Sequence, residues 1–119
     1  MIQYDENVQE MDREFIPTAF SQQELEYAGQ QNFKNAVLSP EGISFDMVAM
    51  ECISFDDSTT EIRHRITLSA RKNDMDRRMF RLHVDTFCSG NGLSPRFIDG
   101  YYDEATLKDM FDYLRELYA

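Results

Sequence analysis

The chain has 119 residues, of which 42% are hydrophobic and 29% are charged, and its formal net charge at pH 7 is −10. The length suits a single domain spanning 1–119, and the composition is that of a folded protein rather than a disordered one. The acidic balance disfavours nucleic-acid backbones and anionic membranes as ligands of the whole surface, and it favours a basic protein partner.

The N-terminal segment, MIQYDENVQEMDRE, is acidic and lacks the basic and apolar regions of a signal peptide. No apolar run reaches the length of a membrane span, so a cytoplasmic protein is expected. Val8, Met11, Phe15 and Ile16 recur at helical spacing until Pro17 interrupts them. A first short helix is therefore predicted before this proline.

A second helix is predicted from about 22 to 36. Ser21 and Glu24 suit a capping box, in which the serine hydroxyl accepts from the Glu24 amide and the carboxylate accepts from the Ser21 amide. The residues that continue the helical spacing are Leu25, Ala28, Asn32, Phe33, Ala36 and Val37. The sequence Ser39-Pro40-Glu41-Gly42 also suits a type I turn, so residues 33–38 could instead form a short strand.

Between residues 43 and 88 the apolar period changes from 3.6 to 2, which predicts strands at about 43–55, 61–71 and 78–88. Short turn sequences join these strands, so an antiparallel meander is expected. One face would pack on helices and the other would face water or a partner. The sequence ISFD occurs at 43–46 and again at 53–56, and the even offset keeps both copies in one alternation.

The strand pair at 61–83 is basic, since it holds seven of the twelve Lys and Arg against three acidic residues, and the rest of the chain sums to −14. The apolar residues share one face if paired residue numbers sum to about 117 for the first two strands and about 150 for the next two. Asp46 then lies opposite Arg71, and Arg65 lies opposite Asp85. We therefore expect a self-neutralised face in preference to one that binds an acidic protein patch or nucleic acid.

The turn at 72–78 holds two cations, Arg77 and Arg78, that have no partner in this scheme. Arginine is enriched at binding hot spots. These two residues are therefore the predicted contact residues of the basic hairpin.

The fifteen residues SGNGLSPRFIDGYYD at 89–103 are rich in Gly, Ser and Pro, so a long loop is predicted there. Phe97, Tyr101 and Tyr102 would fix this loop to the domain, because aromatic side chains bury large apolar areas. An exposed contact surface is the alternative role for these aromatic residues.

A final helix is predicted over 104–118, with Asp103 as its N-cap and no Gly or Pro inside it. Its apolar stripe consists of Leu107, Met110, Phe111, Leu114, Leu117 and Tyr118. The simplest architecture is an α+β fold, in which a three-stranded antiparallel meander is packed on one face by the N-terminal and C-terminal helices.

Two polar residues, Glu51 and His64, interrupt the apolar face of the predicted sheet. In the registers above Glu51 falls opposite Ile66, with His64 as its diagonal neighbour and Thr86 opposite His64. A carboxylate beside an imidazole is the arrangement of a general base. No nucleophile or metal ligand accompanies this pair and helices would cover it, so a satisfied buried pair, or a bulge that turns Glu51 to solvent, is preferred over an enzyme.

The residues Cys52, Cys88, His64 and His83 do not predict a zinc site. His64 and Cys88 have the parity of the apolar face, whereas Cys52 and His83 have the opposite parity, and no paired ligand spacing occurs. Both cysteines are expected to be reduced and packed. The segment SGNGLS lacks the Lys-Ser/Thr ending of a phosphate loop, so neither a metal nor a cofactor is expected.

These features favour a small acidic binding protein without catalytic activity. The leading hypothesis is an inhibitor or immunity-type protein that blocks a basic, nucleic-acid-processing partner protein, including nucleic-acid mimicry as in phage anti-defence proteins. The alternatives are a chaperone or adaptor that binds a client segment, and an enzyme that uses Glu51 and His64. An exposed sheet edge could also pair with a second copy of the chain. The predicted contact residues are Asp5, Glu6, Glu10, Asp12, Glu14, Asp109, Asp112, Glu116, Arg77 and Arg78.

Overall fold

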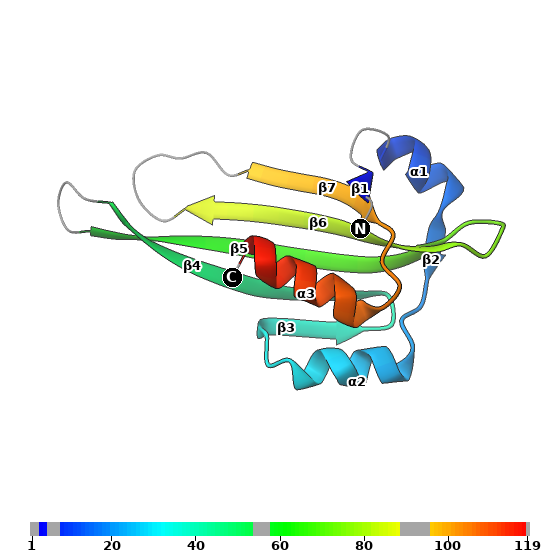
Figure 1. Cartoon of the computed structure of the whole chain (residues 1–119), viewed down its shortest axis with the longest axis horizontal. Coiled ribbons are helices and arrows are strands. Elements are labelled where there is room, and N and C mark those ends of the chain that lie inside the picture. Colours follow the sequence, from blue (N-terminus) through cyan, green and yellow to red (C-terminus); the bar gives the residue numbers. More distant parts are fainter. Residues whose placement is uncertain (1–2, 5–7, 54–57, 89–95, 119) are drawn as a thin grey trace.

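The computed structural model describes residues 3–4, 8–53, 58–88 and 96–118. The fold is α+β, as predicted, and Figure 1 shows helices packed against one long twisted sheet. The elements in chain order are β1 (Gln3–Tyr4), α1 (Val8–Glu14), β2 (Ile16–Thr18), α2 (Gln22–Gln30), β3 (Lys34–Ser39), β4 (Gly42–Ile53), β5 (Ser58–Lys72), β6 (Arg78–Cys88), β7 (Arg96–Tyr102) and α3 (Leu107–Tyr118).

Six strands cross the sheet in the order β1-β7-β6-β5-β4-β3, every pairing is antiparallel, and β2 pairs with the end of β5. The predicted meander forms the centre of this sheet, but a count of three strands was wrong. β1 and β2 have only two and three residues and therefore give no periodic signal. β7 lies within the segment 89–103 that was predicted to be a loop.

The three central strands lie close to their predicted positions. β6 has the predicted bounds of 78–88, and β5 is longer than 61–71 at both ends. β4 begins at Gly42 and is described as far as Ile53, the first residue of the second ISFD sequence. The predicted continuation to residue 55 lies outside the described residues.

The register between β5 and β6 is confirmed, and Arg65 lies opposite Asp85. The register between β4 and β5 was wrong, because Asp46 lies opposite Arg65 instead of Arg71. This shift of six residues is even, so it leaves the apolar residues on one face and the alternation alone could not detect it. β2 occupies the end of β5, with Pro17 opposite Arg71, and β4 pairs further along the strand.

The main core lies between one face of the sheet and the helices α2 and α3 (Figure 1). The buried residues of α3 are Leu107, Met110, Phe111 and Leu114. Phe33 stacks on Phe45 of β4 with 3.9 Å between ring centroids, and Phe111 meets both rings edge-on. Each buried large apolar side chain stabilises the fold by roughly 1.5–3 kcal/mol, so these rings fix α3 on the sheet.

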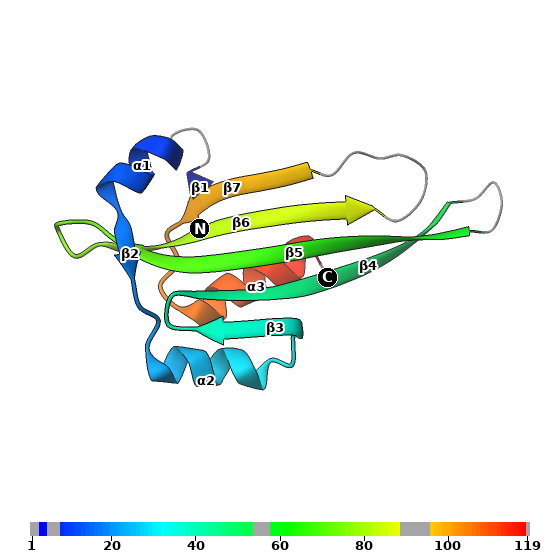
Figure 2. The same ribbon diagram turned by 180° about the vertical axis from the view of Figure 1, so that it is seen from behind.

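The first helix, α1, packs on the opposite face, so the prediction that both chain ends cover the same face was wrong for this helix. Its cluster consists of Phe15, Met79 and Tyr101, with Val8 and Met11 packed against them. Met79 directly precedes Phe80 of the main core, and neighbouring residues of a strand point to opposite faces. In Figure 2, seen from behind, α3 lies beyond the sheet.

The second helix begins as predicted, with a capping box between Ser21 and Glu24. It ends at Gln30 rather than near 36, because Asn32 adopts a left-handed φ of 56° and β3 follows. The alternative of a short strand near 33–38 is thus confirmed. A bulge in β3 and the left-handed Asn35 interrupt this outer strand, and such features oppose pairing with another chain.

The last helix begins at Leu107 instead of 104, since the Thr106 hydroxyl accepts a hydrogen bond from the Asp109 amide at 3.1 Å. Asp103 is therefore not the N-cap, and its carboxylate accepts from Arg77 at 2.7 Å. Tyr101 and Tyr102 are buried, which confirms their fixing role. The side chain of Phe97 lies outside the described residues.

Candidate functional site

The outer surface of α3 carries Asp109, Asp112 and Glu116, all of them exposed. Their spacing of three and four residues places them on one side of the helix. Asp112 contacts Lys108 at 2.6 Å and Arg115 at 3.8 Å, so the cations of this helix share one carboxylate. Asp109 and Glu116 form no ion pair within the described part of the chain. We call these three acidic residues the α3 acidic surface.

The described acidic residues of the predicted N-terminal group lie on another face of the sheet from α3. Glu10 and Glu14 are exposed on α1, which packs on the other face of the sheet from α3. Asp5 and Glu6 lie outside the described residues. Glu10 and Glu14 therefore do not form one continuous surface with the acidic residues of α3.

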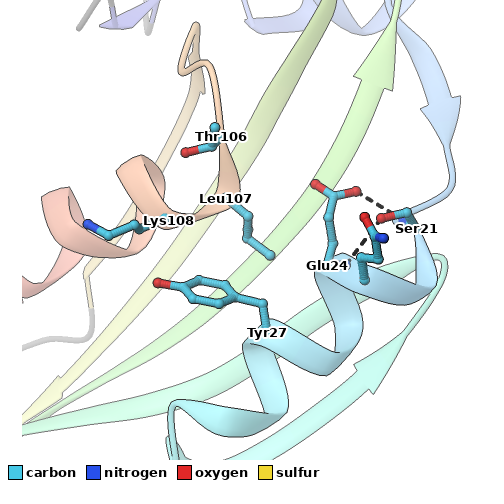
Figure 3. A pocket seen from close by; sticks show the side chains of 7 residues that line it. Ser21, Glu24, Tyr27, Thr106, Leu107 and Lys108 are labelled. Atoms are coloured by element: carbon cyan, nitrogen blue, oxygen red, sulfur yellow. Dashed lines mark hydrogen bonds between the residues drawn. The ribbon is translucent and has the colours of Figure 1, made fainter.

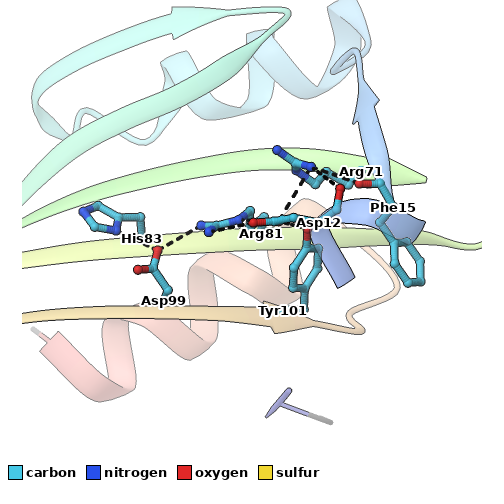
Figure 4. A network of polar contacts seen from close by, with 7 residues as sticks. All are labelled: Asp12, Phe15, Arg71, Arg81, His83, Asp99 and Tyr101. Atoms are coloured by element: carbon cyan, nitrogen blue, oxygen red, sulfur yellow. Dashed lines mark hydrogen bonds and ion pairs between the residues drawn. The ribbon is translucent and has the colours of Figure 1, made fainter. Parts of the chain in front are cut away.

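Asp12 of α1 points toward Arg81, Arg71 and Tyr101 of the sheet (Figure 4). Its carboxylate accepts hydrogen bonds from Arg81 Nε at 2.9 Å and from the Tyr101 hydroxyl, and Arg71 lies 3.6 Å away. Arg71 also donates to the Phe15 carbonyl at the end of α1, at 2.9 Å. Burial alone would raise the pKa of Asp12, but the bonds from Arg81 and Tyr101 outweigh it and hold this pKa below its usual value.

The same network continues to His83, for which the sequence predicted no functional role (Figure 4). Its Nδ1 lies 2.7 Å from Asp99 and its Nε2 lies 3.0 Å from Asp85. Arg81 also donates to Asp99, at 2.9 Å. Burial alone would lower the pKa of His83, but both carboxylates outweigh it and raise this pKa. The sequence predicted that His83 and Asp85 lie on the same face of β6. It did not predict Asp99 as their neighbour, because Asp99 lies in the segment that was predicted to be a loop.

Asp46 is the centre of a second polar cluster, which lies on the face of the sheet opposite the main core. Asp46 is only 6% exposed. It accepts hydrogen bonds from Arg65 at 3.0 Å and from the Asn35 amide at 2.8 Å, and Arg63 lies 3.6 Å away. Burial alone would raise the pKa of Asp46, but these partners outweigh it and lower this pKa. A charge this buried requires such partners.

Neither of the predicted hairpin contacts, Arg77 and Arg78, lacks a partner in the structure. Arg77 binds Asp103 at 2.7 Å, and Arg78 donates two hydrogen bonds to Glu24 at 2.8 and 2.9 Å. The Arg78 guanidinium also lies 5.3 Å from the centroid of the Phe80 ring. A bidentate bond over an aromatic ring fixes this arginine inside the fold.

Every Lys and Arg of the basic hairpin has an acidic partner in the chain, as expected for a self-neutralised face. Each of the seven Lys and Arg in 61–83 has a carboxylate within 3.6 Å. Most of the partners come from outside the hairpin, from helices and neighbouring strands. They are Glu24, Asp12, Asp46, Asp99 and Asp103, besides Glu61 and Asp76 within it.

The predicted neighbourhood of Glu51 and His64 was wrong, because Glu51 lies opposite Thr60 and Met47 lies opposite His64. The side chain of Glu51 lies outside the described residues. His64 does lie opposite Thr86, as predicted, and its Nδ1 is 2.9 Å from the threonine hydroxyl. Burial lowers the pKa of His64, which favours a neutral ring at pH 7.

The histidines face different ways, as their parity predicted. The His64 ring packs on Tyr118 of α3 at 4.5 Å, whereas His83 lies on the opposite face with Asp99. The side chains of Cys52 and Cys88 lie outside the described residues. Within the residues that the structure does describe, no three His, Cys, Asp or Glu side chains are arranged to hold a metal ion.

A groove of about 220 Å³ opens where the first turns of α2 and α3 meet (Figure 3). It is lined by Ser21, Gln23, Glu24, Tyr27, Thr106, Leu107 and Lys108. Tyr27 and Leu107 extend toward each other across it and provide apolar walls. Glu24 is held by Arg78 and by the Ser21 amide, and these bonds outweigh burial and lower its pKa. The sequence located the capping box but gave no sign that it lines a groove.

No protein-family model, curated protein sequence or solved structure matches this chain. None of the helices in the described part of the chain combines the length and the apolar character needed to cross a bilayer.

Proposed function

We propose that this chain is a non-enzymatic binding protein that uses the α3 acidic surface to block a basic protein partner. The partner class that this chemistry suits is a nucleic-acid-processing enzyme, whose binding cleft carries Lys and Arg for phosphates. The chain would then act as an inhibitor or immunity-type protein in the cytoplasm, with a row of carboxylates in place of a phosphate backbone.

One observation supports this proposal above the others: every cation of the basic hairpin is paired with a carboxylate of the same chain. Asp109 and Glu116 are exposed and form no ion pair within the described residues. The surface charge available to a partner is therefore negative and includes α3. Complementary charge accelerates association and suppresses wrong partners.

The α3 helix is better suited to this role than α1. It has twelve residues and four buried side chains that fix it to the core, whereas α1 has seven residues, none of them buried. A surface that is already rigid loses less conformational entropy on binding. One of the three predicted acidic residues of α1, Asp12, is also engaged with Arg81.

The test is capture of partners from source-cell lysate by the immobilised chain, at low and at high salt. We expect a basic protein to be retained at low salt and released at high salt, because salt screens exposed charges. Asp109→Lys combined with Glu116→Lys should abolish capture and should abolish inhibition of the captured protein. Glu10→Lys combined with Glu14→Lys is the matched control, since it changes the net charge equally on the opposite face.

Two outcomes would overturn the proposal. Capture that survives the α3 double substitution would exclude the α3 acidic surface as the contact. Salt-resistant capture of an apolar segment would favour the chaperone or adaptor hypothesis instead.

A further inference from the structure

The groove between α2 and α3 is small. Its volume of about 220 Å³ is below the range of about 300–1,000 Å³ that is usual for sites of drug-sized ligands and cofactors. Pockets that receive one anchoring side chain are common at the centre of protein interfaces. Size therefore favours a residue of a partner protein as the occupant.

The walls of this groove are preformed. Leu107 is only 3% exposed, and Tyr27 stacks on Phe111 of the core with 6.0 Å between centroids. The capping box and the two bonds from Arg78 fix Glu24 at the opposite side. A partner would find these side chains already in place.

The charges of the groove select the type of side chain that fits. Glu24 is bound by Arg78, and Lys108 is bound by Asp112 at 2.6 Å. An arginine or lysine inserted here would meet no carboxylate that lacks a cation, while its own charge would lose water. An apolar side chain would cover the Tyr27 ring and Leu107 without such a penalty.

The α3 acidic surface begins beside this groove, since Lys108 lines the groove and pairs with Asp112 of that surface at 2.6 Å. We propose that the groove receives one apolar side chain, such as leucine, from a partner segment whose neighbouring Lys or Arg residues lie on the α3 acidic surface. This inference rests on the proposed function and narrows it: the recognised segment is basic and carries an apolar anchor.

The experiment uses two short lysine peptides that differ only in one central residue, leucine or alanine, added to the isotope-labelled chain and followed by NMR. We expect both peptides to shift the amide signals of Asp109 and Glu116 at low salt. Only the leucine peptide should also shift the signals of Tyr27 and Leu107. Its affinity should exceed that of the alanine peptide about tenfold, as for an anchoring side chain.

Gln23→Trp is designed to fill the groove from an exposed lining position without changing a charge or the core. In this variant the leucine peptide should no longer shift the amide signals of Tyr27 and Leu107, and the leucine and alanine peptides should bind with equal affinity. Gln30→Trp, at an exposed position near the other end of α2, is the matched control and should leave both unchanged.

The outcomes separate this inference from the function on which it rests. If Asp109 and Glu116 shift but the two peptides bind equally, the groove is not the anchor site and the acidic surface stands. Equal loss of binding in both tryptophan variants would also overturn the inference. If neither peptide shifts Asp109 or Glu116, the proposed function itself fails.

Discussion

At the scale of single residues, the two histidines have opposite electrostatic environments. Both ring nitrogens of His83 contact carboxylates, at 2.7 and 3.0 Å. A neutral imidazole has only one N–H, so this geometry fits the doubly protonated ring. His64 contacts a threonine hydroxyl and an aromatic ring instead, which fits a neutral ring.

We predict that the two imidazole signals in an NMR titration have midpoints on either side of 6.5, the ordinary value. The pKa of His83 is raised by Asp99 and Asp85 against burial, and that of His64 is lowered by burial. His83 therefore stabilises the fold fully below pH 6.5, and this contribution is lost as the pH rises through its folded pKa. His64 acts in the opposite direction, and stability is lost as the pH falls from 6.5 through its folded pKa.

The variant His83→Gln tests whether the higher titration midpoint belongs to His83. In this variant the imidazole signal with the higher midpoint should disappear and the other should remain. The variant's loss of unfolding free energy in urea should be larger near pH 5.5 than near pH 8.5, by at most about 1 kcal/mol, since water screens this partly exposed pair. Coincident midpoints, or an equal loss at both pH values, would contradict the assignment.

At the scale of elements, α1 depends on the sheet for its structure. Its seven residues are fewer than an isolated helix needs in water. Asp12 ties it to Arg81 and Tyr101, and the Arg71 guanidinium binds the carbonyl of Phe15 beyond its last turn. Cations near a helix C-terminus satisfy its unpaired carbonyls and oppose the negative end of its dipole.

Asp12→Asn should therefore lower the free energy of unfolding by about 1–2 kcal/mol, because it removes a charged partner from two arginines. Hydrogen exchange of the α1 amides should become faster, while exchange in α3 should stay unchanged. Glu10→Gln, an exposed change on the same helix, should alter stability by less than about 0.5 kcal/mol. Unchanged α1 protection in Asp12→Asn would contradict this account of docking.

The sequence located these elements better than it located their contacts. Period and capping predicted β6 to the residue and the start of α2 at the Ser21 box, because both signals are local. The start of α3 was misplaced, since Asp103 is by type a better N-cap than Thr106, and only the fold shows that Asp103 binds Arg77 instead. The groove between α2 and α3 could not be predicted from the sequence, because it depends on how two distant helices pack together and no local pattern encodes that packing.

At the scale of the whole molecule, many carboxylates of this acidic chain form ion pairs with its own Arg and Lys residues. Burial alone would raise the pKa values of Asp12, Glu24, Asp46 and Asp99, but hydrogen bonds from their partners outweigh it and lower all four. The charge predicted from composition is thus divided between internal ion pairs and the exposed surface. The composition determines the net charge of −10. Which carboxylates are paired inside the fold and which are exposed depends on the strand register and on the position of α1.

We predict that stability is lost in acid, as the pH falls below about 4. Carboxylates with lowered folded pKa values stabilise the fold above their unfolded values of 3.8 for Asp and 4.5 for Glu, and this contribution is lost as the pH falls through the folded pKa. Urea unfolding at a series of pH values measures it. Asp46→Asn should cost about 1–3 kcal/mol at neutral pH and weaken the acid dependence. Asp74→Asn, an exposed control, should reproduce the unsubstituted curve.

The pairing of the first strands with late ones sets the order in which the molecule can assemble. β1 pairs with Tyr101 and Tyr102, and β2 pairs with residues 70–72. During synthesis the N-terminal segment therefore leaves the ribosome long before its strand partners exist. Such distant contacts slow folding, because a large loop must close before they form. The β4-β5-β6 meander can form first, and β1 and β2 can pair only once β7 and β5 are in place.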